Sequence, residues 1–312
     1  MKLINFLLFT LFLSAGIEVI ADDQNPENKV SNAFSTDKEL EDEVKLEQAA
    51  PSEINNSKTI QGTVLPGQTP NDNKFSQILD ISFNTDNKQN VDGDKSYSSQ
   101  MLYFLYYRPN STYNIRFFTS FGKDFASNYE ETLGDSRITV SHKAFKLSER
   151  LRFTPSGTVV LPTSEESKRN QELNFGIELN PSFTFLMNDF VYFAYIPRVG
   201  KNFHEYTTSR TDAVNVEYRL IQIAVANYSF IDRWYAEYSF VHSQSWAYTG
   251  TRRNPSYMSS FELGHNFSKQ LVLAAGLVQG GNLIDRTNGP DQTVQLFDEN
   301  ETTYYGKFAL SF

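Results

Sequence analysis

From Phe75 onward the chain consists of stretches in which apolar and polar residues alternate, and this alternation is what most constrains its fold. In the stretch 173–183, apolar side chains occupy nearly every second position, and polar or small residues such as Glu178 lie between them. The stretch 113–121 repeats the pattern around Arg116. A period of two places neighbouring side chains on opposite faces of a β-strand, whereas a helix needs a period of 3.6. The sequence therefore predicts that this part of the chain is all-β.

We predict twelve strands, whose connections alternate between short and long. The short connections contain two or three residues, such as Pro109–Ser111, and the long ones are polar, such as 201–212. A soluble β-sandwich does not require this order, but a transmembrane barrel has tight turns at one end and longer loops at the other. The predicted strands are residues 75–85, 98–108, 112–122, 135–146, 150–162, 172–186, 190–200, 213–230, 233–247, 256–267, 271–284 and 303–312.

The hydropathy of the chain excludes helices as the membrane-spanning elements. Its mean hydropathy is -0.45, and no segment of residues 75–312 is long and apolar enough for a spanning helix. In lipid every backbone N–H and C=O must be bonded within the protein, which only helices and closed barrels achieve. Each predicted strand is long enough to cross an apolar band of about 25 Å at a steep tilt. We therefore predict that residues 75–312 form a transmembrane, up-and-down antiparallel β-barrel.

Two segments precede the predicted barrel. Residues 1–21 are typical of a cleaved signal peptide, with Lys2 before an apolar run and Ala21 at the cleavage site. Residues 22–74 carry eleven Asp or Glu against five Lys and one aromatic residue, Phe34. Such a composition buries too little apolar surface to offset the entropy of ordering, so we predict a disordered acidic arm in the periplasm. It could act as a tether or fold back to occlude a pore.

The last strand carries apolar residues at alternate positions up to a terminal phenylalanine. This ending resembles the signal that the barrel assembly machinery of Gram-negative bacteria recognises, and the chain as a whole resembles an outer-membrane β-barrel. The resemblance covers residues 75–312 as an architecture and only the last nine residues as a motif. It implies an outer-membrane location, with lipid, lipopolysaccharide and the assembly machinery as partners. The residues of this predicted assembly signal are Tyr304, Gly306, Phe308, Leu310 and Phe312.

Aromatic residues are concentrated near the predicted strand ends. Tyr and Trp favour both membrane interfaces, where the ring is in an apolar layer and its polar group meets water. We predict an aromatic girdle that includes Tyr113, Tyr228, Trp234, Trp246, Tyr248 and Tyr257.

If the apolar face contacts lipid, the charged residues of the opposite face line the lumen. Five acids and five bases are predicted there, a mixed lining that could create a transverse field and select small solutes. The same charges could instead pair across a lumen filled by side chains. The predicted lumen-lining residues are Asp80, Arg116, Lys143, Arg152, Glu178, Glu217, Arg219, Glu237, Glu262 and Lys307.

The sequence gives little support for catalysis, a metal or a cofactor. His242-Ser243 invites comparison with outer-membrane hydrolases, but the two side chains are predicted on opposite faces of their strand. His204 lies in a predicted loop, and the histidines lack the spacing of metal ligands. Asp and Glu exceed Lys and Arg by 37 to 28, which argues against nucleic-acid binding. We therefore predict no catalytic residue, metal or cofactor.

The favoured hypothesis for function is a porin-like, passive channel for small polar or charged solutes. The alternative is a non-conducting structural or surface-interaction barrel whose loops contact partners, and an outer-membrane hydrolase ranks last.

Overall fold

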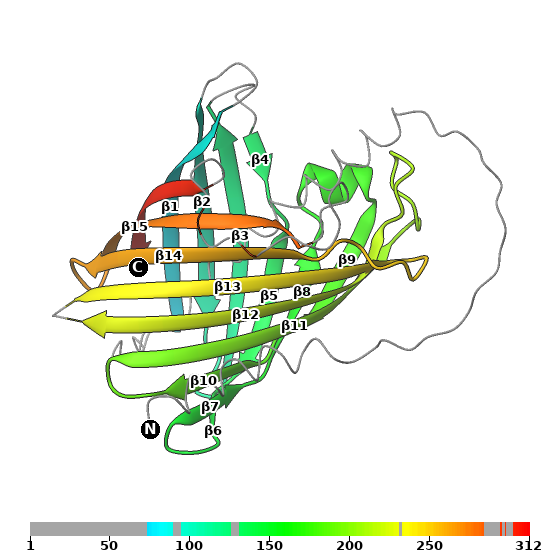
Figure 1. The fold of residues 1–312 in the computed structure, drawn as a ribbon. Coiled ribbons are helices and arrows are strands. Elements are labelled where there is room, and N and C mark those ends of the chain that lie inside the picture. The colour runs from blue at the N-terminus through cyan, green and yellow to red at the C-terminus, as the bar shows by residue number, and fades with distance from the viewer. Residues whose placement is uncertain are drawn as a thin grey trace. The chain divides into compact units, whose positions relative to one another are not determined.

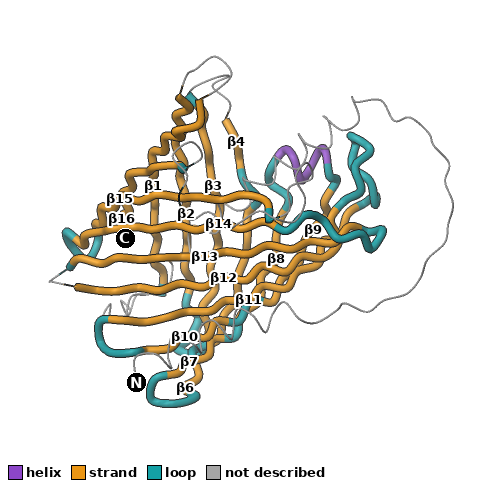
Figure 2. The backbone as a smooth tube through the Cα atoms, viewed as in Figure 1, coloured by secondary structure: helices purple, strands orange, loops and turns teal. Residues whose placement is uncertain are grey.

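The computed structural model describes residues 74–89, 95–125, 131–230, 233–283 and 302–312, together with the single residues 294 and 297. All of them belong to one compact unit. The predicted signal peptide, and the predicted acidic arm except Lys74, lie outside the described residues. Figure 2 shows that the described part is mostly strand and holds one short helix.

The described strands all belong to a single antiparallel sheet. The short helix is a π-helical turn, Glu166–Asn170. The strands are β1 Phe75–Gln89, β2 Lys95–Tyr107, β3 Tyr113–Asp124, β4 Glu131–Leu133, β5 Ser136–His142, β6 Phe145–Lys146, β7 Leu151–Thr154, β8 Ser156–Leu161, β9 Leu173–Leu179, β10 Ser182–Leu186, β11 Val191–His204, β12 Val216–Phe230, β13 Trp234–Ala247, β14 Ser256–Asn266, β15 Leu271–Asn282 and β16 Thr303–Ser311.

The sheet closes on itself. Neighbours run in the order β12, β13, β14, β15, β16, β1, β2, β3, β5, β8, β9 and β11, and β11 also pairs with β12. The small strands β6, β7 and β10 continue the crossings of β5, β8 and β9, and β4 pairs antiparallel with the end of β3 (Figure 1). The wall is therefore a barrel of twelve crossings, which confirms the predicted fold class and strand number.

The two faces of the wall differ as the alternation predicted. On β9, Ile177 and Leu179 are exposed on the outer face, whereas the alternate residues Gly176 and Glu178 are buried on the inner face. The same contrast follows β5, where Ile138 is exposed and Arg137 is buried. In a soluble sandwich the exposed side chains of such strands would be polar. An outer face rich in exposed Ile, Leu, Val and Phe is the pattern of a wall that contacts lipid.

Three prolines interrupt one side of the wall. Pro155 separates β7 from β8, Pro181 lies between β9 and β10, and Pro197 lies within β11. The pairing of β9 and β10 with β11 keeps one register on both sides of Pro181, which places Pro181 opposite Pro197. The pairing of β9 with β8 and of β10 with β7 likewise places Pro181 opposite Pro155. Asn180 N donates to Ser156 O at 3.0 Å, so the backbone of Asn180 faces β8. Because successive residues of a strand direct their backbone groups to opposite sides, the backbone of Pro181 faces β11. Since neither Pro181 nor Pro197 has an N–H, the ladder lacks both bonds at this position.

Replacing this facing pair, by Pro181→Thr together with Pro197→Val, is expected to complete the ladder between β9, β10 and β11. Hydrogen exchange of the amides around residues 180–183 and 196–199 should then slow, because each restored bond contributes about 1 kcal/mol. Pro155→Thr is the matched control, since Pro155 O accepts from His142 N and that position therefore faces β5. Equal slowing in the control and the double variant would contradict this account of the wall.

Candidate functional site

One part of the inner face carries a cluster of carboxylates around a single lysine. Asp80 on β1, Glu237 on β13 and Glu262 on β14 are each less than 10% exposed. Lys307 Nζ on β16 lies 2.6 Å from Glu262 Oε2 and 3.9 Å from Asp80 Oδ2. Asn227 Nδ2 on β12 donates to Glu237 Oε2 at 3.2 Å. We call these residues the acidic wall; three carboxylates against one ammonium give it an excess of negative charge.

Two tyrosines fix the central carboxylate of the acidic wall. Tyr235 Oη donates to Glu262 Oε1 and Tyr305 Oη donates to Glu262 Oε2, both at 2.8 Å. The tyrosine rings lie where glycines leave room. A Cβ on Gly264 would be 2.3 Å from the Tyr235 ring, and a Cβ on Gly276 would be 2.5 Å from Tyr305 Oη. The orientation of Glu262 therefore depends on two glycines of neighbouring strands.

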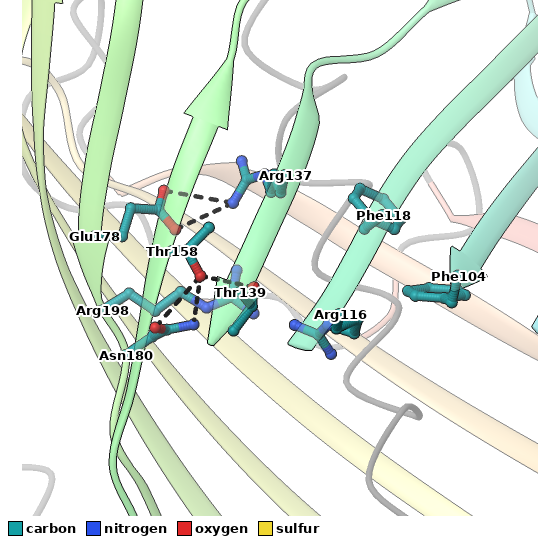
Figure 3. A pocket seen from close by; sticks show the side chains of 9 residues that line it. All are labelled: Phe104, Arg116, Phe118, Arg137, Thr139, Thr158, Glu178, Asn180 and Arg198. Carbon is teal, nitrogen blue, oxygen red and sulfur yellow. Dashed lines mark hydrogen bonds and ion pairs between the residues drawn. The ribbon is translucent and has the colours of Figure 1, made fainter. Parts of the chain in front are cut away.

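A second part of the inner face is rich in arginine. Arg116 on β3, Arg137 on β5 and Arg198 on β11 line one pocket, together with Glu178 on β9 (Figure 3). Arg137 Nη1 lies 3.3 Å from Glu178 Oε2, and both side chains are about 10% exposed. Arg219, at the inward register position opposite Gly200, lies on the adjoining strand β12. We call these residues the arginine wall; four guanidinium groups against one carboxylate give it an excess of positive charge.

The remaining lining of this pocket is neutral. Thr139 Oγ1 and Thr158 Oγ1 are 2.8 Å apart, and Asn180 Nδ2 donates to Thr158 Oγ1 at 3.2 Å. At the other end of the pocket, the rings of Phe104 and Phe118 are tilted against each other with centroids 5.0 Å apart. The pocket thus joins guanidinium groups to an aromatic surface.

The two walls face each other across the lumen. In the closed order of strands, the acidic wall is centred on β15 and the arginine wall on β8, half-way around the ring. The strand registers can be followed around the barrel in both directions, and the tilt of the strands adds a stagger that must be subtracted. With that stagger subtracted, Asp80, Glu262 and Lys307 lie at the same height along the barrel as Arg137, Glu178 and Arg198. Opposite charges therefore meet the lumen at one level of the barrel.

Most of the predicted lumen-lining residues lie on the inner face. Those at the level of the walls are Asp80, Arg116, Glu178, Arg219, Glu237, Glu262 and Lys307. Arg152 also occupies an inward position, but it is exposed and lies toward the short connections.

The structure corrects two predicted lumen residues. Lys143 is exposed and lies between β5 and β6, outside any strand. Glu217 lies at a register irregularity between Val216 and Tyr218, and its Oε1 is 3.0 Å from Lys201 Nζ. Because Lys201 also donates to Tyr218 Oη on the outer face, Glu217 is directed away from the lumen. A β-bulge changes the face to which nearby side chains point, and the alternation of the sequence alone does not reveal where a bulge lies.

Sequence reasoning missed two arginines of the arginine wall. Arg137 is the second residue of β5, and Arg198 follows Pro197 in β11. The register of the segment 190–200 is uncertain from sequence, because proline and glycine interrupt its alternation. The structure places Ala194 and Ile196 on the inner face. Arg198 has the same alternation phase as these two residues, and that phase would have identified it as a lumen residue.

The predicted girdle is only partly exposed. Tyr113, Tyr228 and Trp234 are at least 40% exposed near the short connections. Tyr257 is only 6% exposed, and Tyr248 Oη instead donates to Asn202 O at 2.9 Å, so these two rings do not form an exposed belt. Trp246 is half-buried. Four residues of the predicted assembly signal share the outer register of β16, which pairs with β1 and β15, and Phe312 directly follows that strand.

The candidates for other chemistry are not brought together. His242 is opposite Gln222 and Ser243 opposite Ile221, so the two side chains point to opposite faces of β13. His204 Nδ1 contacts Tyr248 Oη at 3.4 Å. In the described part of the chain, no three His, Asp or Glu residues are arranged to hold a metal ion. Among the same residues, no helix is long and apolar enough to span a membrane.

Comparisons with known proteins identify the architecture. No protein-family model matches the chain, and no curated protein matches it by sequence. An outer membrane channel from Pseudomonas putida F1 superimposes with a TM-score of 0.55 at 13% identity, covering 80% of this chain and 100% of that one. The NanC porin superimposes with a TM-score of 0.50 at 10% identity, covering 75% and 98%. The chain therefore has the β-barrel fold of outer-membrane porins and channels, as its sequence predicted.

Proposed function

We propose that this protein is an integral outer-membrane channel that passes small polar or charged solutes passively. The observation that carries the proposal is the pair of oppositely charged walls at one level of a closed barrel. Such an arrangement creates a field across the lumen and orients dipolar or charged solutes as they pass. Channels and porins of the same fold support it, and so does the apolar outer face, which matches the surface that lipid requires.

A second reading is favoured by one observation. Two apolar clusters, one around Ile223 and Val241 and one around Leu102 and Phe104, are buried on inward-facing positions. A lumen filled at these clusters would not conduct, and the barrel would then act through its loops. Conductance separates the two readings directly.

The test is a planar-bilayer recording of the full-length protein and of Arg116→Glu. We expect steady single-channel conductance. In a salt gradient, the reversal potential of the variant should shift toward cation preference, because a negative charge replaces a positive one in the arginine wall. Lys143→Glu is the matched control: it makes the same charge change at an exposed site beyond the wall and should shift the potential much less.

Two results would contradict the proposal. Absence of conductance from well-folded protein would support the barrel that acts through its loops. Equal shifts in Arg116→Glu and Lys143→Glu would show that the arginine wall does not select ions.

A further inference from the structure

Two apolar clusters face the lumen and are almost completely buried. The first spans β11 to β15 and includes Ile223 and Val241, which are 0% and 2% exposed. The second lies on β2 and β3 and includes Phe104, which is 3% exposed. Val241 shares one face of β13 with Glu237, so it points inward as the acidic wall does. Side chains that face a lumen are this inaccessible only where something in the lumen covers them.

The side chains of the wall do not supply this cover. Eight strands enclose a lumen that side chains just fill, whereas this barrel has twelve crossings. The two clusters lie nearly opposite each other, because β13 and β2 are five places apart in the closed order of twelve. The strand registers, with the stagger subtracted, place both clusters at the height of the two charged walls. Since all described strands belong to the wall, the cover is a segment of the chain outside the described residues.

The N-terminal arm is the segment that fits. Two long stretches lie outside the described residues, namely 1–73 and the connection 284–301 apart from Val294 and Phe297. These two apolar side chains of the connection are 40% and 52% exposed, so they do not cover the clusters. The first stretch contains the arm, which is long and leads directly into β1.

The arm joins the barrel beside the second cluster. Lys74 O accepts from Arg108 N at 2.8 Å, and Ile78, four residues further on, packs against that cluster. Residues 66–73 contain two prolines, a glycine and two asparagines, which favour turns. A stretch of this length spans up to about 25 Å, enough to return the residues before it to the clusters.

The composition of residues 59–65 suits a position between two apolar surfaces. They read TIQGTVL, carry no charge and supply the apolar side chains Ile60, Val64 and Leu65. Ten of the eleven acidic residues of the arm precede residue 54. Burying an apolar side chain is favourable, whereas burying an unpaired charge is costly. The uncharged segment can therefore enter the lumen while the acidic part of the arm remains outside.

We propose that residues 59–65 of the arm lie in the lumen between the two apolar clusters and narrow the channel. The two charged walls lie on the other sides of the segment, so it divides the lumen rather than filling it. The position of the segment does not depend on conduction, but its effect on conductance rests on the proposed function.

The test of position is disulfide formation in the folded, full-length protein, whose sequence contains no cysteine. Val241→Cys combined with Ile60→Cys or with Val64→Cys should form an internal disulfide on mild oxidation, because cross-linking requires Cα atoms within about 7 Å. Val64→Cys with Ile177→Cys, on the exposed outer face, is the matched control and should not cross-link. Failure of both arm positions to cross-link, or a disulfide of Val241→Cys with Val294→Cys instead, would overturn the proposal.

The test of effect is single-channel conductance of the full-length protein carrying Val64→Asp and Leu65→Asp. Two charges between apolar clusters should displace the segment, and conductance should rise at least about twofold through the wider path. Asn55→Asp with Asn56→Asp is the matched control, since it adds the same charge to the arm ahead of the segment and should leave conductance unchanged. Conductance that stays the same in the first variant, or rises equally in both, would contradict the narrowing.

The outcome for the arm is distinguishable from that for the channel. Conductance without a disulfide from either arm position would refute the position of the segment and leave the channel intact. A disulfide from the arm, with no conductance even when Val64 and Leu65 are replaced, would support the position and refute the passive channel.

Discussion

Replacing Lys307 with methionine is expected to destabilise the barrel by about 3–5 kcal/mol, which makes it one of the most damaging single substitutions in the wall. Lys307 Nζ is 2.6 Å from Glu262 Oε2, and the two side chains are 7% and 5% exposed. Methionine keeps much of the side-chain volume but removes the one ammonium among the three carboxylates of the acidic wall. Their mutual repulsion, away from water, then has no compensating cation.

The measurement is urea unfolding of the lipid-reconstituted protein, followed by the fluorescence of its two tryptophans. The matched control is Lys307→Met combined with Glu262→Gln, which removes both members of the pair. The double variant should recover much of the lost stability, because a neutral glutamine can still accept from one of Tyr235 and Tyr305 through its carbonyl oxygen and donate to the hydroxyl oxygen of the other through its amide nitrogen. A double variant no more stable than the single one would show that the charge balance of this wall is not what Lys307 supplies.

The architecture of this protein could be predicted from its sequence because strand alternation and connection length are local signals. The stretch 173–183 shows its two faces in the sequence itself, and the structure confirms them with exposed Leu179 beside buried Glu178. The short connection at Met187–Asp189 likewise defines a hairpin, since Asn188 Oδ1 accepts from the backbone N–H of Val191 at 2.8 Å. Each of these features is set by residues close together in the chain.

The site was only partly predictable, because it depends on positions far apart in the chain. Alternation assigns Glu178 and Lys307 to the inner face, but not the side of the lumen to which each belongs. That requires the closing pair β11 and β12 and the stagger around the ring. Local irregularities caused the other errors: Glu217 is re-aimed at a break in register, and Pro197 concealed the position of Arg198.

Replacing Glu178 with glutamine is expected to have the opposite electrical effect to Arg116→Glu and to cost about 3–5 kcal/mol of stability. Glu178 is the one carboxylate of the pocket, and its Oε2 lies 3.3 Å from Arg137 Nη1. Glutamine preserves its shape but leaves the guanidinium groups of the arginine wall facing one another. In a salt gradient the reversal potential should move toward anion preference, and urea should unfold the variant at a lower concentration.

Glu237→Gln is the matched control, because Glu237 and Glu178 are both 9% exposed on the inner face. It removes the same charge from the opposite wall, so the reversal potential should again move toward anion preference. Stability should respond differently. Glu237 shares its wall with two other carboxylates and is bound by the neutral Asn227, so its loss relieves repulsion and should cost little or even stabilise the barrel. Equal destabilisation by the two variants would mean that the charges are not divided between two walls, since only that division makes one carboxylate a counter-ion and the other a source of repulsion.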